Sequence, residues 1–122
     1  MYSAQLLDHF QNPRNAGDLM DADAVVEIEN PVCGDVLRLS VKFEAGRISA
    51  IRFKAQGCVP AMACGSALTE LAVGKTADQA RGIDRAELTE AVGGLPQASS
   101  HAAQLALDAL FAALARVKTL RQ

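Results

Sequence analysis

The sequence predicts an α+β fold: a three-stranded antiparallel sheet with helices packed on one face. Segments 35–44 and 47–56 alternate apolar and polar residues with a period of two, and Ala45-Gly46 forms a tight turn between them. This alternation buries one face of the sheet and wets the other, so helices must cover the apolar face. After Pro60 the apolar residues recur at helical spacing instead.

The N-terminal half is expected to hold one helix and the three strands. Ser3 can cap a helix over residues 4–11, which ends at Asn12 because the residue before a proline avoids the helical region. Residues 24–29 form the first expected strand. Leu37, Leu39, Val41, Phe43, Ile51, Phe53 and Ala55 are expected to face the core, whereas Arg38, Ser40, Lys42, Glu44, Arg52, Lys54 and Gln56 are expected to face water.

Helices are predicted for the rest of the chain. Pro60 suits a first helical position. Thr76 and Asp84, each followed three residues later by Gln or Glu, resemble capping boxes that open two short helices. Residues 95–98 read as a connector, and a serine at 99 or 100 can cap a last helix that runs to about residue 119.

Length and composition favour a single domain over residues 1–122 with an aliphatic core, since half of the residues are hydrophobic. The net charge of −2 and the lack of a basic run argue against nucleic acid and anionic membranes as partners. The first residues resemble no secretory signal, and no apolar run is long enough for a membrane span. We therefore expect a cytoplasmic protein whose three cysteines are reduced thiols, used for metal binding or catalysis more often than for disulfides.

Four side chains with metal-binding chemistry lie in three expected loops: Cys33, Asp35, Cys58 and His101. If these loops converge, they form a site of two sulfurs, one oxygen and one nitrogen. Cys58 and His101 lie at predicted helix N-termini, where the positive end of the helix dipole favours a thiolate and a neutral imidazole. These are the forms that bind metal, so we expect Cys58 to ionise easily and His101 to stay neutral.

Simpler interpretations stay open for these residues. Cys64 lies on the apolar side of its predicted helix, with Leu68 and Leu71, and is expected to be a core residue. His101 could equally be a surface residue, Asp35 could cap a turn, and His9 is expected to be exposed or to cap a helix. The ligand spacing alone is weak evidence, because the gaps are long and contain no CxxC pair.

A set of short motifs covers nearly the whole chain and is highly specific in combination. They are Tyr2-Ser3, Asp8-His9-Phe10, Asn12-Pro13-Arg14-Asn15-Ala16-Gly17, Pro31-Val32-Cys33-Gly34-Asp35, Phe53-Lys54-Ala55-Gln56-Gly57-Cys58, Ala61-Met62-Ala63, Thr69-Glu70 and Gly74-Lys75. With these motifs the sequence resembles the iron–sulfur cluster assembly scaffolds of the IscU type, also found as the N-terminal domain of NifU. The resemblance implies the same α+β fold.

The resemblance also implies a scaffold rather than an enzyme. Such a scaffold takes sulfur from a cysteine desulfurase, assembles a transient [2Fe–2S] cluster with iron and passes it to apo iron–sulfur acceptor proteins. Some members instead hold zinc in the same pocket, and one branch resembles a zinc-dependent sulfur-transfer partner. The implied ligands for either cargo are Cys33, Asp35, Cys58 and His101, because His can replace Cys on iron and tetrahedral Zn²⁺ accepts S, N and O.

Two departures from the family pattern bear on function. The family has a cysteine after the histidine, but Ala102 stands there in this chain. With two thiolates instead of three, we expect weaker binding of both cargoes and a larger loss for iron–sulfur chemistry. The Leu-Pro-Pro-Val-Lys segment that an Hsp70-type chaperone grips is also altered, because Gln97, Ala98 and Ser99 replace its last three residues, which argues against that partner.

Three hypotheses remain on sequence alone. The first is an atypical scaffold that binds a cluster or zinc, in a chain with enough core to fold without metal. The second is an enzyme with Cys58 as nucleophile and His101 as base, for which the sequence shows no oxyanion-hole or substrate-pocket motif. The third is an interaction module of the same fold that binds no metal, and the retention of all four candidate ligands argues against it.

Overall fold

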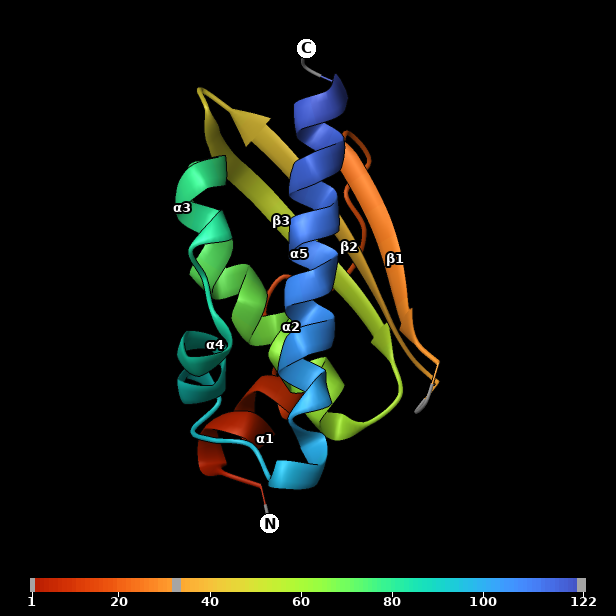
Figure 1. The fold of residues 1–122 in the computed structure, drawn as a ribbon, viewed down its shortest axis with the longest axis vertical. Helices are drawn as coiled ribbons and strands as arrows, with labels where there is room; N and C mark the ends of the chain where they lie inside the picture. Colours follow the sequence, from red (N-terminus) through yellow and green to blue (C-terminus); the bar gives the residue numbers. More distant parts are fainter. Residues whose placement is uncertain (1, 32–33, 121–122) are drawn as a thin grey trace.

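A computed structural model describes residues 2–31 and 34–120 and confirms the predicted α+β fold (Figure 1). The elements are α1 (Ala4–Gln11), β1 (Ala24–Asn30), β2 (Asp35–Glu44), β3 (Arg47–Gln56), α2 (Val59–Ala72), α3 (Ala77–Arg81), α4 (Arg85–Ala91), η1 (Gln97–Ser99) and α5 (His101–Leu120). The predicted bounds of the first helix and of the second and third strands coincide with those observed. The connector expected at residues 95–98 differs, because a short 3₁₀ helix begins within it.

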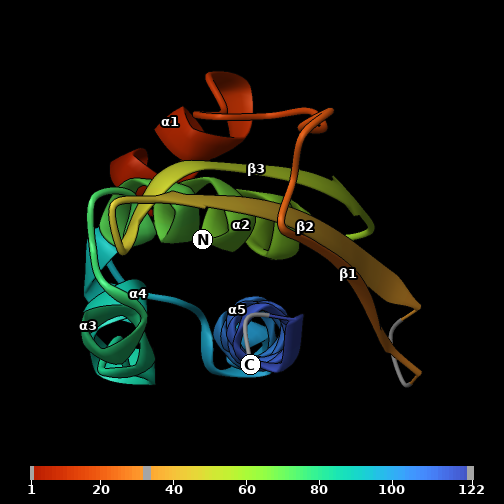
Figure 2. The same cartoon turned by 90° about the horizontal axis from the view of Figure 1, so that it is seen from above.

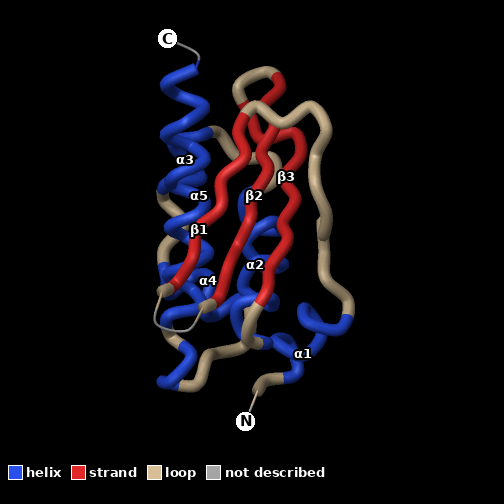
Figure 3. The backbone as a smooth tube through the Cα atoms, turned by 90° about the vertical axis from the view of Figure 1, so that its right-hand side faces the viewer, coloured by secondary structure: helices blue, strands red, loops and turns tan. Residues whose placement is uncertain are grey.

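The sheet has the antiparallel order β1-β2-β3, with the strands side by side in Figure 3. Helix α2 packs against β3, and α5 packs against β1 and β2, so both lie on one face, as Figure 2 shows from above. The side chains expected to face the core are buried, except that Ala55 is only half-buried. Ser40 was wrongly expected in water: it is 1% exposed, since its small side chain lies between the longer cross-strand partners Val25 and Arg52.

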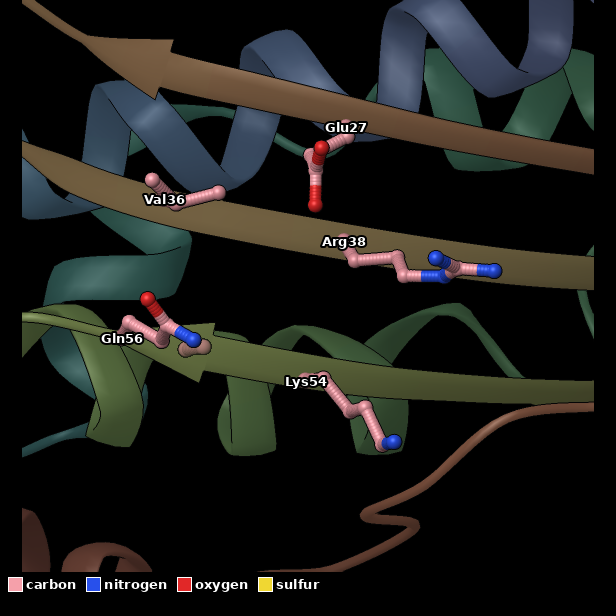
Figure 4. Close-up of a pocket in the computed structure, with 6 residues that line it drawn as sticks. Glu27, Val36, Arg38, Lys54 and Gln56 are labelled. Carbon is pink, nitrogen blue, oxygen red and sulfur yellow. The ribbon is translucent and has the colours of Figure 1, made fainter.

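The outer face of the sheet carries a row of charged residues across the three strands. Glu27 on β1 lies opposite Arg38 on β2, which lies opposite Lys54 on β3, and the three line a shallow pocket of about 420 Å³ (Figure 4). Asp18, from the loop after α1, contacts Arg38 at 3.2 Å and Lys54 at 3.0 Å. Lys54 above all lowers the pKa of Asp18, so this carboxylate stays charged and ties the loop to the sheet.

Helix α2 is the central helix of the molecule. The sequence indicated one apolar stripe, but α2 is buried on several sides because it packs against α1, α4 and α5 as well as β3. Gly65 allows the close approach to the sheet: a Cβ there would lie 2.7 Å from Cδ2 of Phe53 and 3.2 Å from Cδ1 of Leu37. Cys64 is fully buried in the core, which confirms its expected structural role.

His9 is buried, contrary to the expectation of an exposed or capping residue, and joins α1 to α2. The residue is 7% exposed, and its Nδ1 lies 2.7 Å from the hydroxyl of Ser66. The same hydroxyl accepts a hydrogen bond from the backbone N–H of Arg14 at 2.9 Å. This polar junction replaces apolar packing where α1 meets α2, a role that spacing alone does not reveal.

The burial of His9 predicts that the fold loses stability in mild acid. Burial chiefly, with the Arg14 charge, lowers the pKa of His9 below its ordinary 6.5, while Glu70 and Asp8 oppose the shift. Between pH 6.5 and the lower pKa of the native state, the unfolded chain binds more protons at His9 than the folded chain does. The free energy of unfolding is therefore not reduced by this histidine above pH 6.5, and it falls as the pH drops toward the native pKa. Urea unfolding midpoints should fall over this range in the wild type and less in His9→Gln. If the unfolding midpoint fell equally steeply with pH in the wild type and in His9→Gln, this assignment would be contradicted. His101→Gln is the control: it keeps His9 and should therefore retain the wild-type pH dependence.

None of the helices in the part of the chain that the structure describes combines the length and the apolar character that a membrane span requires.

Candidate metal centre

Three of the four predicted ligands meet at one end of the sheet. Asp35 begins β2, Cys58 is the N-cap of α2, and His101 begins α5. The starts of these three elements lie toward the lower end of the molecule in Figure 1. The structure brings one oxygen, one sulfur and one nitrogen of these residues within 4.8 Å of one another. The fourth predicted ligand, Cys33, lies outside the described residues, so its placement remains a prediction.

Asp35 is the centre of this arrangement and is only 2% exposed. Its Oδ1 accepts a hydrogen bond from the backbone N–H of Cys58 at 3.0 Å. Its Oδ2 accepts one from the thiol of Cys58 at 3.2 Å and lies 3.3 Å from Nε2 of His101. The carboxylate therefore does more than cap a turn, because it holds the other two candidate ligands beside it.

His101 is half-buried rather than a free surface residue, with 30% of its side chain exposed. It also lines a cleft of about 250 Å³ between the end of β1 and the start of α5, together with Glu29, Gln104 and Asp108. The imidazole thus contacts the buried carboxylate of Asp35 and borders a solvent-open cleft. The imidazole side of the site can therefore be reached from solvent.

The expectation that Cys58 ionises easily is wrong for the metal-free chain. Burial chiefly raises the pKa of the Cys58 thiol, and the neighbouring Asp35 carboxylate raises it further. The backbone N–H of Ala61 lowers the pKa, as expected at a helix N-terminus, but its effect is smaller than that of burial. At neutral pH the thiol is therefore protonated, and a metal must displace this proton to bind the sulfur.

Cys64 does not contribute to this site. It is fully buried, and burial raises the pKa of its thiol to about 12. A soft metal needs the thiolate, which is disfavoured at such a position. Ala102, in the first turn of α5, is 1% exposed and offers no ligand atom.

The donor set fits a thiophilic metal. Zinc ligands at roughly 2.0–2.3 Å in a tetrahedron lie about 3.3–3.8 Å apart, so donors within 4.8 Å need only a small contraction. Sulfur, imidazole nitrogen and a carboxylate oxygen are ligands that zinc and iron both accept. The described residues thus offer three candidate ligands for a tetrahedral metal.

Gly57 also shapes the site, although the sequence indicated it only as the residue before Cys58 in one of the family motifs. Its φ of +130° is one that residues other than glycine rarely adopt, and its α-carbon faces the carboxylate of Asp35. A glycine directly before a candidate ligand, at the end of a strand, was the sequence signal available for it.

An α+β domain that brings a thiol, an imidazole and a carboxylate together at one end of its sheet has the donor set of a metal-binding domain. Comparison with known proteins places it further: residues 1–122 match the model of the NifU-like N terminal domain, and the chain belongs to this family. The relatives named below are called scaffold proteins, not enzymes.

The chain is 48% identical over 110 residues to the iron-sulfur cluster assembly scaffold protein IscU 1 of Archaeoglobus fulgidus, covering 90% of this chain and 72% of that protein. It is 38% identical over 125 residues to the iron-sulfur cluster assembly scaffold protein IscU of Escherichia coli K12, covering 99% and 97%. Among solved structures, a putative iron-sulfur cluster assembly scaffold protein of Fervidobacterium islandicum AW-1 has a TM-score of 0.77 at 21% identity, covering 93% and 96%. At that identity the last likeness shows the fold alone.

Proposed function

We propose that this chain is an iron–sulfur cluster assembly scaffold that holds its cargo, a transient [2Fe–2S] cluster or the iron that precedes it, between Cys33, Asp35, Cys58 and His101. One observation carries the proposal: a carboxylate, a thiol and an imidazole from three separate segments meet within 4.8 Å. Relatives that are named iron–sulfur scaffolds support it. Sulfur would come from a cysteine desulfurase, and the cluster would pass to apo iron–sulfur acceptor proteins.

The residues present suit temporary rather than permanent binding. Asp35 is a hard oxygen ligand in a site otherwise made of softer donors, so its bond to a cluster iron is the weakest in the set. The solvent-open cleft beside His101 gives a route for transfer. The function also requires reduced thiols, which the cytoplasm maintains.

A second candidate is a zinc-bound accessory protein for sulfur transfer. The observation that favours it is Ala102, which leaves two candidate thiols, a carboxylate and an imidazole. This set matches tetrahedral zinc as well as it matches a cluster.

The other two hypotheses have less support. A nucleophilic cysteine reacts as the thiolate, whereas burial chiefly, with the Asp35 carboxylate, raises the pKa of the Cys58 thiol. An interaction module without metal does not explain why three ligand side chains converge around one buried carboxylate.

Metal analysis and anaerobic reconstitution test the proposal. The purified chain is assayed for zinc and iron, then incubated with Fe²⁺, cysteine, a cysteine desulfurase and a thiol reductant that converts persulfide to sulfide, while visible absorption is recorded. A scaffold is expected to develop the visible bands of a [2Fe–2S] cluster, and an added apo acceptor is expected to carry those bands after the two proteins are separated. Zinc retention without visible bands would select the accessory protein, and failure to bind either metal would contradict both candidates.

A further inference from the structure

The turn between β3 and α2 has a gap that the carboxylate of Asp35 fills. A Cβ built on Gly57 would overlap Oδ1 of Asp35, and would lie 2.8 Å from its Cγ and 3.0 Å from its Cα. Real Cβ atoms essentially never come so close to another heavy atom. The carboxylate therefore occupies the space that any other residue at position 57 would fill with its own side chain.

This placement gives the two oxygens of Asp35 different partners. Oδ1 lies over Gly57 and accepts the backbone N–H of Cys58 at 3.0 Å. Oδ2 points to the other candidate ligands, 3.2 Å from the sulfur of Cys58 and 3.3 Å from Nε2 of His101. One oxygen is thus held by the backbone, and the other faces the place where a cargo would bind.

We infer that Gly57 is a positioning residue that fixes Asp35 as a ligand through one oxygen, Oδ2, by leaving room for Oδ1 against the backbone of α2. This inference rests on the proposed function, because it concerns how the same site holds its cargo. The hydrogen bond from the Cys58 N–H holds Oδ1 against the backbone of α2, whereas Oδ2 faces the other candidate ligands. This geometry favours one bond from Asp35, through Oδ2, which suits a cargo that must be released.

Gly57→Ala tests the inference, and Gly17→Ala is the matched control. Both glycines have similar positive φ values, +130° and +123°, but nothing lies within 4 Å of a Cβ at Gly17. Each replacement carries the same kind of backbone strain, so only Gly57→Ala adds the collision with Asp35. We expect Gly57→Ala to weaken Zn²⁺ binding, measured against a chromophoric chelator, by about 10–100-fold, the range seen when a residue that orients a ligand is lost. Gly17→Ala is expected to stay within about twofold of the wild type.

The Asp35→Ala background separates an effect on the carboxylate from a general effect on the turn. Removing the carboxylate removes the atoms that a Cβ at position 57 would strike first. In that background Gly57→Ala is therefore expected to change Zn²⁺ affinity by no more than about twofold, a coupling that a purely structural role would not produce. An equal loss in both backgrounds, or no loss in either, would overturn the inference. If Gly57→Ala alone fails to fold, folding of the double variant supports the inference, and failure of both contradicts it.

A spectroscopic measurement on the metal-free protein keeps this test independent of the proposed function. The Cys58 amide is expected to show the downfield proton shift of a hydrogen bond to a carboxylate in the wild type and in Gly17→Ala, and to lose it in Gly57→Ala. If the wild type binds no metal, the proposed function fails, but the amide shift still decides whether Gly57 positions Asp35. An unchanged amide shift in Gly57→Ala would overturn the inference even if metal binding were normal.

Discussion

Replacing Cys58 with alanine is expected to abolish stoichiometric zinc and cluster binding, whereas replacing Cys64 with alanine is expected to leave both intact. Cys58 places its sulfur 3.2 Å from the buried carboxylate of Asp35, within the group of three candidate ligands. Its loss removes a thiolate, the strongest kind of ligand available to a soft metal. The loss of affinity should exceed the roughly 10–100-fold that follows loss of an outer-shell partner.

Cys64 makes this comparison strict, because each variant loses one thiol: Cys58 at the N-cap of α2, or Cys64 six positions later within that helix. Cys64 is fully buried, and burial raises the pKa of its thiol to about 12, so it should not bind metal in the native state. Truncating it should instead cost stability, on the order of 1 kcal/mol, through a small cavity. Zinc content, cluster absorption and urea unfolding, measured on both variants, separate the two effects. Equal metal loss in both would show that Cys64 is a ligand after all, and full metal content in Cys58→Ala would refute the site.

The fold could be predicted from the sequence because its signals are local. The period-two alternation in β2 and β3 and the capping residue Ser3 each specify an element without knowledge of the rest of the chain. Predictions failed where tertiary packing decides. Helix α2 is enclosed by several elements, which a single apolar stripe cannot indicate. His9 is buried where α1 packs on α2, and its ring contacts Ser66, 57 positions away in the sequence.

The candidate site was predicted in part. Residue chemistry and the family resemblance identified Asp35, Cys58 and His101 as ligands, and the structure brings all three together. The ionisation of Cys58 was predicted wrongly, because the sequence shows the helix N-terminus but not the burial and the nearby carboxylate that oppose it. The glycine directly before Cys58 marks the position, but its role depends on a contact with Asp35, 22 positions earlier in the chain, which the sequence does not show.

Ala102→Cys is expected to convert a weak cluster site into a strong one. Position 102 directly follows His101 in the first turn of α5, and a thiolate there would add a third sulfur to a set that now offers two candidate thiols. Iron–sulfur clusters are held chiefly by cysteine thiolates, so the reconstituted [2Fe–2S] yield and the half-life of its visible bands should both rise, by about tenfold or more. Zinc affinity should rise as well, since zinc forms strong bonds to thiolates.

Ala102→Ser separates the chemistry of this change from its effect on packing. Ala102 is 1% exposed, so any larger side chain there must displace neighbouring atoms, at a cost of about 1–3 kcal/mol. Serine adds one heavy atom, as cysteine does, and imposes a similar strain, but its hydroxyl is a poor ligand for iron in a cluster. If sulfur ligation is what the chain lacks, only Ala102→Cys gains a longer-lived cluster, while both variants lose stability in urea. Equal cluster yields in the wild type, Ala102→Ser and Ala102→Cys would show that alanine at this position is no handicap. The case for a zinc-bound accessory protein would then lose the observation on which it depends.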